Sequence, residues 1–171
     1  MKSLSVKEKK NNMAAAKSQI VERKTHTRGN YINAVGRRKE AVARVRLHET
    51  VQEGMMWGKI EIKKGDIVVN EKMISEYFPG EVNRFKYTEP LRVANAQNKY
   101  TITISVSGGG PAGQLDAVVN GLAHALANAD SEAFKPALRK QGLLTRDARV
   151  RERRKVGTGG KARRKKQSPK R

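Results

Sequence analysis

The feature that most restricts how this chain can fold is the uneven placement of its positive charge. The 171 residues include 37 Lys and Arg against 16 Asp and Glu, for a net charge of +21. Residues 1–29 carry a net +6 and residues 149–171 a net +11, whereas the 119 residues between them carry only +4. Because only the middle stretch combines nearly balanced charge with enough length to bury a core, we expect one globular domain at 30–148. A basic N-terminal arm (1–29) and a basic C-terminal tail (149–171) flank it.

The tail has too few apolar residues to fold by itself. Its only apolar side chains are those of Val150, Val156 and Ala162, and three glycines loosen its backbone. We therefore expect it to be disordered until it meets an anionic partner. A tail that serves only solubility is the alternative, but a net +11 in 23 residues favours a nucleic-acid-binding extension.

Other classes of protein are disfavoured by what the sequence lacks. There is no cysteine, which excludes disulfides, thiolate metal sites and cysteine nucleophiles. No run of about 18 apolar residues is present, so we expect neither a spanning helix nor a membrane partner. The arm lacks the apolar region of a secretory signal. Because it is rich in Lys and contains Glu8 and Glu22, a retained arm is favoured over a cleaved transit peptide, which stays open as the alternative.

Alternation of apolar and polar residues predicts the strands. Apolar and polar residues alternate throughout residues 99–107, which are rich in β-branched side chains. A similar alternation predicts a second strand over residues 34–47. One face of that second strand carries Ala41, Ala43, Val45 and Leu47. Residues 57–64 and 67–69 are predicted to form two further short strands, joined near Gly65.

Helical spacing predicts a long amphipathic helix over residues 111–128. Ala117, Gly121 and Ala125 form a second edge of small residues on it, which allows close approach to a neighbouring element. A short helix is predicted from Pro136 to just before Gly142, another over 70–78, and irregular chain after that. Together these elements predict an α+β fold, a two-layer sandwich with helices packed on one sheet.

The glycine-rich residues 108–113 join the predicted strand over 99–107 to the predicted helix over 111–128. A strand, a glycine loop and a helix in this order are the layout of phosphate-binding loops. No Lys-Ser/Thr pair follows, so a tight turn that can touch RNA backbone is favoured over a nucleotide site. The histidines offer no catalytic pair, because Asp116 and His124 lie about two turns apart on the predicted helix. We expect no catalytic, metal or cofactor site, and His26 and His48 are interpreted as surface or packing residues.

Arginine dominates the basic stretches, and its planar fork binds phosphate through two hydrogen bonds at once. Aromatic residues make up only 5% of the chain, which disfavours recognition by base stacking. We therefore expect recognition of the backbone and shape of a folded RNA.

Several blocks of sequence carry a family resemblance. They are GRRKEAVARVR (36–46), EYFP (76–79), GGG (108–110) with Gly113-Gln114, LRKQGLLTRD (138–147), KARR (161–164) and the terminal Lys170-Arg171. In this order they resemble ribosomal protein nine of the small subunit, in its bacterial or organellar form, from about residue 31 to the last residue. The resemblance implies an α+β two-layer sandwich, similar to the second domain of small-subunit protein five, with a long C-terminal extension.

The resemblance also implies a function and its residues. The chain would be a structural constituent of the small subunit, bound to 16S-type rRNA and to neighbouring proteins in the subunit head, in a bacterial cytoplasmic ribosome or, alternatively, an organellar one. Lys170 and Arg171 would contact the P-site tRNA. The implied rRNA-binding residues are Arg37, Arg38, Lys39, Arg44, Arg46, Arg146, Arg149, Arg151, Arg153, Arg154, Lys155, Lys161, Arg163, Arg164, Lys165 and Lys166.

Some positions depart from the family pattern. His124 and Val119 stand on the long helix where basic residues are common, which puts an rRNA contact from that face in doubt. Two other classes of function stay open: a free-standing nucleic-acid packaging or chaperone protein, and an enzyme of the wider fold superclass.

Overall fold

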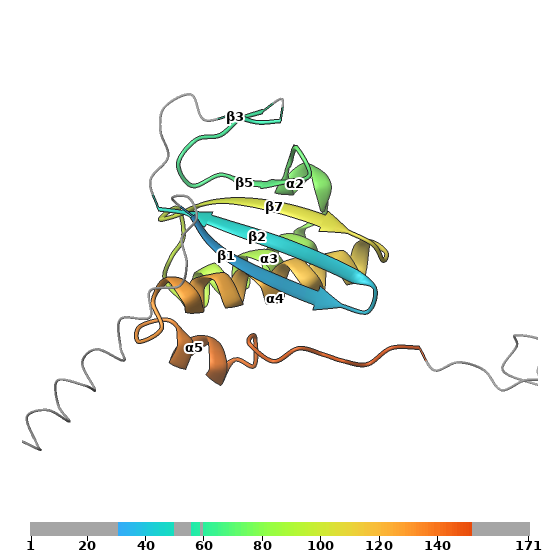
Figure 1. Ribbon diagram of the computed structural model, residues 1–171, viewed down its shortest axis with the longest axis vertical. Helices are drawn as coiled ribbons and strands as arrows, with labels where there is room; N and C mark the ends of the chain where they lie inside the picture. The colour runs from blue at the N-terminus through green and yellow to red at the C-terminus, as the bar shows by residue number, and fades with distance from the viewer. Residues whose placement is uncertain (1–30, 50–55, 59, 152–171) are drawn as a thin grey trace, which may run out of the picture.

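The computed structural model describes residues 31–49, 56–58 and 60–151 (Figure 1). The predicted arm and residues 152–171 of the predicted tail lie outside this part. The elements follow in the order β1 (Tyr31–Arg38), β2 (Ala41–His48), β3 (Met56–Trp57), β4 (Ile60–Glu61), β5 (Ile67–Val69), β6 (Lys72–Met73), α2 (Ile74–Tyr77), α3 (Glu81–Val93), β7 (Thr101–Ser107), α4 (Pro111–Ala129) and α5 (Lys135–Lys140).

A mixed sheet forms the centre of the fold. Its strand order is β1-β2-β7-β5-β6, with β5 parallel to β7 and the other neighbours antiparallel. Helices α3 and α4 lie behind one face of the sheet (Figure 1). The structure is thus a mixed fold of sheet and helices, compatible with the predicted α+β class.

The core lies between this sheet face and α4. Ala41, Ala43, Val45 and Leu47 of β2 are all fully buried, which confirms the predicted face. They meet the buried stripe of α4, which includes Leu115, Val118, Leu122 and Leu126. Since burying each large aliphatic side chain contributes about 1.5–3 kcal/mol, this contact is the main stabilising interface of the domain.

Strand β1 and α4 approach each other closely through glycines. A methyl group added at Gly36 would overlap the carbonyl oxygen of Ala117 and the backbone nitrogen of Gly121. Conversely, a methyl group at Gly121 would lie 2.8 Å from a side-chain carbon of Val45 and 3.1 Å from the nitrogen of Gly36. The predicted edge of small residues on this helix is therefore confirmed, and it brings the end of β1 close to the middle of α4.

The prediction of one strand over 34–47 was wrong, because this stretch is a hairpin. Arg38 pairs with Ala41, so Lys39 and Glu40 form the turn. The phase of the alternation changes there: Ala34 and Gly36 are buried before the turn, and odd-numbered residues are buried after it. No Gly, Asn or Pro marks the turn, and Lys39 itself adopts a positive φ of 50°.

Three other segments also differ from the predictions. Residues 57–64 are not one strand, because Met56–Trp57 pairs with Ile60–Glu61 as a separate two-stranded sheet. Residues 70–78 form strand β6 and the four-residue α2 instead of one helix. The structure shows α3 where irregular chain was predicted. This helix buries only Tyr87, Pro90 and Leu91 and contains a proline, so its sequence has little helical signal.

Candidate nucleic-acid interface

The face of β1 and β2 that points away from the helices carries exposed arginines. Its cross-strand pairs are Arg37 with Val42, Val35 with Arg44, and Asn33 with Arg46. Ser105 and Ser107 of β7 are the partners of Arg44 and Val42 on the other side of β2. Arg37 and Arg44 are exposed. Because both side chains are exposed, their guanidinium groups are accessible to a phosphate backbone.

Arg46, on the same face, is held between two aromatic rings. Its guanidinium carbon lies 5.2 Å from the ring centre of Tyr31 and 5.2 Å from that of Trp57. A cation over the face of an aromatic ring is attracted by the ring's quadrupole. Arg46 is half-buried as a result, so it is less accessible than Arg37 and Arg44.

His48 is a packing residue, as predicted. It is buried at the end of β2, and its Nε2 lies 3.2 Å from the hydroxyl oxygen of Thr103. Burial, with a smaller contribution from the charge of Arg46, lowers the pKa of His48 below its ordinary value of 6.5. The imidazole is therefore neutral at pH 7 and adds no charge to this face.

The glycine loop before α4 is packed against the β1–β2 hairpin. Gly108 and Gly109 both have positive φ, and a methyl group at Gly108 would overlap the carbonyl oxygen of Glu40. The loop is thus a tight turn whose shape is set by this neighbouring turn. Lys39 is exposed at the tip of the hairpin.

A chain of hydrogen bonds joins two of the sequence blocks that carry the family resemblance, EYFP (76–79) and GGG (108–110) with Gly113-Gln114. The hydroxyl of Tyr77 donates to Oε1 of Gln114 at 3.0 Å, and Nε2 of Gln114 donates to the carbonyl of Gly108 at 3.1 Å. Nδ2 of Asn70 donates to the carbonyl of Val106 at 2.9 Å and to the Tyr77 hydroxyl at 3.3 Å. These residues join α2, β7 and α4 and have a structural role that the sequence did not indicate.

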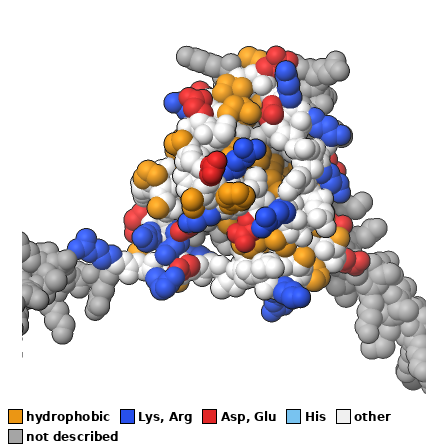
Figure 2. Space-filling view, turned by 180° about the vertical axis from the view of Figure 1, so that it is seen from behind, with side chains coloured by type: hydrophobic (Ala, Val, Ile, Leu, Met, Phe, Trp, Pro, Cys, Tyr) orange, Lys and Arg blue, Asp and Glu red, His pale blue; other side chains and the backbone are white. Residues whose placement is uncertain are grey.

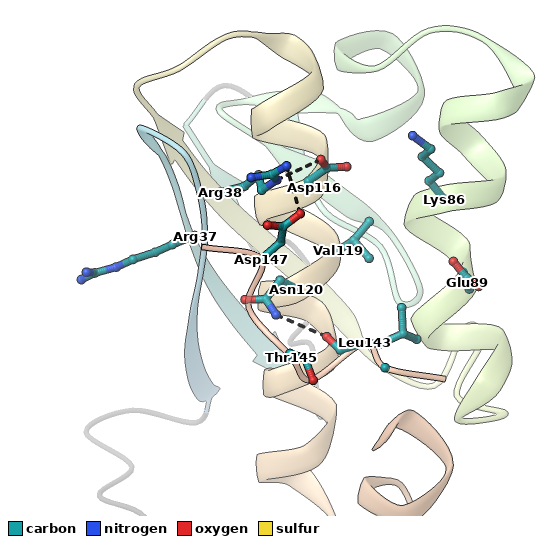
Figure 3. Close-up of a pocket in the computed structure, with 11 residues that line it drawn as sticks. Arg37, Arg38, Lys86, Glu89, Asp116, Val119, Asn120, Leu143, Thr145 and Asp147 are labelled. Carbon is teal, nitrogen blue, oxygen red and sulfur yellow. Dashed lines mark hydrogen bonds and ion pairs between the residues drawn. The ribbon is translucent and has the colours of Figure 1, made fainter. Parts of the chain in front are cut away.

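Arg38 makes contacts of a different kind from those of its neighbour Arg37. Its Nη2 lies 3.0 Å from Oδ2 of Asp147, and its Nε lies 3.6 Å from Oδ2 of Asp116 on α4 (Figure 3). Its Nη1 donates a hydrogen bond of 2.7 Å to the carbonyl oxygen of Arg149. The side chain is only 14% exposed. Arg38 thus connects β1, α4 and the chain after α5, and we call these contacts the Arg38 clamp.

Asp147 is shared by two arginines. Its Oδ1 accepts hydrogen bonds from the backbone nitrogen and from Nε of Arg149, and its Oδ2 contacts Nη2 of Arg149 at 2.7 Å. The side-chain hydrogen bonds from Arg149, then the backbone hydrogen bond, hold the pKa of Asp147 well below its ordinary value. The carboxylate is therefore ionised throughout the physiological range.

A cleft of about 310 Å³ lies beside the clamp. Lys86 and Glu89 of α3, Val119 of α4 and Leu143 are among its lining residues, and Nδ2 of Asn120 donates to the carbonyl of Leu143 at 3.3 Å (Figure 3). On this helix side, basic, acidic and apolar side chains are interspersed (Figure 2). Arg37 also lines the cleft, although its side chain points away from it (Figure 3).

The described residues contain no group of three His, Asp or Glu side chains that could hold a metal ion. Among residues 31–49, 56–58 and 60–151, no helix is long and apolar enough to cross a membrane. Of the predicted RNA-binding residues, the structure places Arg37, Lys39, Arg44, Arg146, Arg149 and Arg151 on the surface. The remainder of the tail set lies outside the described residues, namely Arg153, Arg154, Lys155, Lys161, Arg163, Arg164, Lys165, Lys166, Lys170 and Arg171.

Comparison with known proteins identifies the family. The family model described as ribosomal protein S9/S16 matches residues 36–171. The chain is also 42% identical over 124 residues to the small ribosomal subunit protein uS9 of Cutibacterium acnes (strain DSM 16379 / KPA171202). That match covers 72% of this chain and 64% of the length of the relative. The chain with the exposed sheet arginines and the Arg38 clamp therefore belongs to the ribosomal protein S9/S16 family.

Proposed function

We propose that this chain is a structural component of the small ribosomal subunit and binds the subunit's rRNA, with no catalytic activity of its own. The observation that carries the proposal is the exposed arginine pair, Arg37 and Arg44, on the face of the sheet opposite α4. Membership of the family supports the same reading. Neighbouring proteins of the subunit head are its expected protein partners.

The proposed mode of recognition is contact with the RNA backbone. Arginine can donate two parallel hydrogen bonds to a phosphate, and such charge-assisted bonds are about twice as strong as neutral ones. The aromatic rings on this face, Tyr31 and Trp57, already contact Arg46. Backbone contacts position a protein on folded RNA without reading base sequence, which suits a component that recognises one fixed rRNA shape.

The proposed ligand set consists of the exposed cations and the half-buried Arg46, and it leaves Arg38 to another role. Among the described residues it comprises Arg37, Lys39, Arg44, Arg46, Arg146, Arg149 and Arg151. The basic residues of 152–166 extend this set along the tail. At the tip we propose that Lys170 and Arg171 contact the P-site tRNA, as the family resemblance implies. This proposal divides the chain into a basic arm (1–29), an rRNA-binding domain (30–148) and a basic tail (149–171).

Substituting both exposed sheet arginines tests the rRNA interface. We expect the double variant Arg37→Gln/Arg44→Gln to bind head rRNA about 10-fold to 100-fold more weakly, because each charge-assisted hydrogen bond contributes about 1.5–3 kcal/mol before solvent exposure reduces it. The log–log salt slope of the affinity would become less steep by about 2. Filter binding to a head rRNA fragment at several salt concentrations measures both quantities.

Arg84→Gln/Arg92→Gln is the matched control, since it also removes two positive charges, but from exposed positions on α3. We expect it to bind nearly as the parent does. Equal losses in the two double variants would show that only net charge matters and would remove the sheet face from the interface.

The tip of the tail is tested separately. We expect Lys170→Gln/Arg171→Gln to leave assembly into small subunits intact and to weaken P-site tRNA binding about 10-fold to 30-fold, at roughly 1 kcal/mol for each solvated contact. Gln substitution keeps the length of the chain, so only charge changes. Reconstituted subunits titrated with tRNA provide the measurement. Unchanged tRNA affinity combined with defective assembly would assign the tip to rRNA instead.

A further inference from the structure

We propose that Arg38 is a positioning residue, which with Asp147 fixes the point where the basic tail leaves the domain. The clamp joins the β1–β2 hairpin and the first tail residues into one composite surface for the phosphate backbone of RNA. The RNA-binding part of this inference rests on the proposed function, whereas the positioning part rests on the contacts of the free protein.

The direction of the Arg38 side chain is set by strand geometry. Successive residues of a strand point to opposite faces, so Arg37 lies on the open face while Arg38 turns toward α4. The close packing of Gly36 against Ala117 and Gly121 then brings Arg38 within 3.6 Å of Asp116, one residue before Ala117. All three nitrogens of its guanidinium have a protein oxygen near them. Little of this group is left for a phosphate.

The chain after α5 is held to α4 and β1 at two places, and we call residues 142–149 the strap. At the first, Asn120 donates to the carbonyl of Leu143, and Leu143 packs partly against the core. At the second, Arg38 contacts Asp147 and the carbonyl of Arg149. Arg149 is separated from Arg38 by 111 positions of sequence, so this contact fixes the root of the tail relative to a distant hairpin.

The charges of the clamp balance. Arg38 and Arg149 are offset by the carboxylates of Asp116 and Asp147. Without Asp147, only Asp116 would remain to offset the charges of Arg38 and Arg149, and two like charges repel at this range. Asp147 is therefore an acidic residue that permits a basic surface to assemble.

The surface that results contains exposed cations from both segments. Arg37 and Lys39 come from the hairpin, and Arg146 and Arg151 from the strap and the residues just beyond it. A site whose cations are already positioned loses less conformational freedom when it binds. The spacing of repeated phosphates along an RNA backbone fits a surface with several fixed cations and no deep pocket.

Asp147→Asn gives the sharpest test, because simple electrostatics and the clamp predict opposite results. Removing a negative charge from a basic protein strengthens RNA binding if only net charge matters. If Asp147 positions the strap, the variant binds head rRNA about 3-fold to 10-fold more weakly, since one charge-assisted contact is lost. Glu132→Gln makes the same charge change at an exposed position outside the clamp, and it is expected to bind as the parent or slightly more tightly.

Arg38→Lys is the second variant, because it keeps the charge and removes the planar fork. In the full-length free protein we expect the amides of Thr145 and Arg149 to exchange about five-fold faster or more, while β7 and α4 keep their protection. Retained protection in β7 and α4 shows that the domain is folded. This measurement needs no RNA, so it separates the clamp from the proposed function.

Each outcome decides the proposal. Weaker RNA binding by Asp147→Asn together with faster strap exchange in Arg38→Lys supports it. If Asp147→Asn matches Glu132→Gln in RNA affinity, or if strap exchange in Arg38→Lys equals that of the parent, positioning by the clamp is overturned. Loss of RNA affinity in Arg38→Lys with unchanged strap exchange would make Arg38 a direct RNA ligand. A parent protein that binds no head rRNA at all would refute the proposed function while leaving the exchange result intact.

Discussion

Gly36→Ala is expected to lower the free energy of unfolding by about 3 kcal/mol, the upper end of the usual range for overpacking. The added methyl group would overlap the carbonyl oxygen of Ala117 and the backbone nitrogen of Gly121. Both are backbone atoms in the middle of α4, so neither can move aside by changing a rotamer. Relief requires β1 to shift away from the helix, which would also withdraw Arg38 from Asp116.

Chemical denaturation of the full-length protein measures this loss. Gly110→Ala is the matched control, since a methyl group there meets nothing within 4 Å and the residue has a negative φ of −111°. We expect the control to lower the free energy of unfolding by no more than about 1 kcal/mol, since Gly110 is the N-cap residue of α4 and Ala is a poorer N-cap than Gly. Equal stabilities for the two variants would mean that β1 and α4 do not pack as closely as the structure shows.

The sequence predicted the elements that bury a regular face. Strand β7 and helix α4 repeat their apolar residues at one period over their whole lengths, so periodicity alone located them. Helix α3 was missed because only three of its 13 residues are buried. Its Val82 and Phe85 are 70% and 68% exposed, so apolar residues on it do not mark a buried stripe. Periodicity detects burial and says little about an element that is held mainly by its neighbours.

The candidate site was predicted only as a set of cations. Arg37-Arg38-Lys39 reads as one basic cluster in the sequence, yet the hairpin assigns its three members to the open face, the clamp and the turn. Between Gly36 and Ala41 the apolar positions change from even-numbered to odd-numbered residues, which marks a turn. Once this turn is recognised, the alternation predicts that Arg38 points toward α4. The partner Asp147 could not be found in this way, because it lies far from Arg38 in the sequence and their contact depends on the tertiary fold.

Removing residues 152–171 is expected to have the largest effect on RNA binding. This segment contains ten Lys and Arg and a single acidic residue, Glu152. Ending the chain after Arg151 keeps every residue of the clamp, so the domain and strap are expected to stay folded. If the removed segment contacts about eight phosphates, the log–log salt slope becomes less steep by about 6 to 7.

The difference between the two proteins therefore depends strongly on salt. Between 50 mM and 200 mM salt, the full-length chain is expected to lose about 10⁵-fold in affinity for head rRNA, whereas a truncated chain with two or three domain contacts loses about 10-fold to 30-fold. Filter binding across this range of salt concentrations measures both slopes. The Arg37→Gln/Arg44→Gln substitutions in the truncated chain then test whether the remaining salt dependence comes from these two arginines. A truncated chain with the full-length slope would remove the tail from the interface. Because counterion release depends on the number of phosphates neutralised, the slope counts the contacts of each segment independently of its conformation.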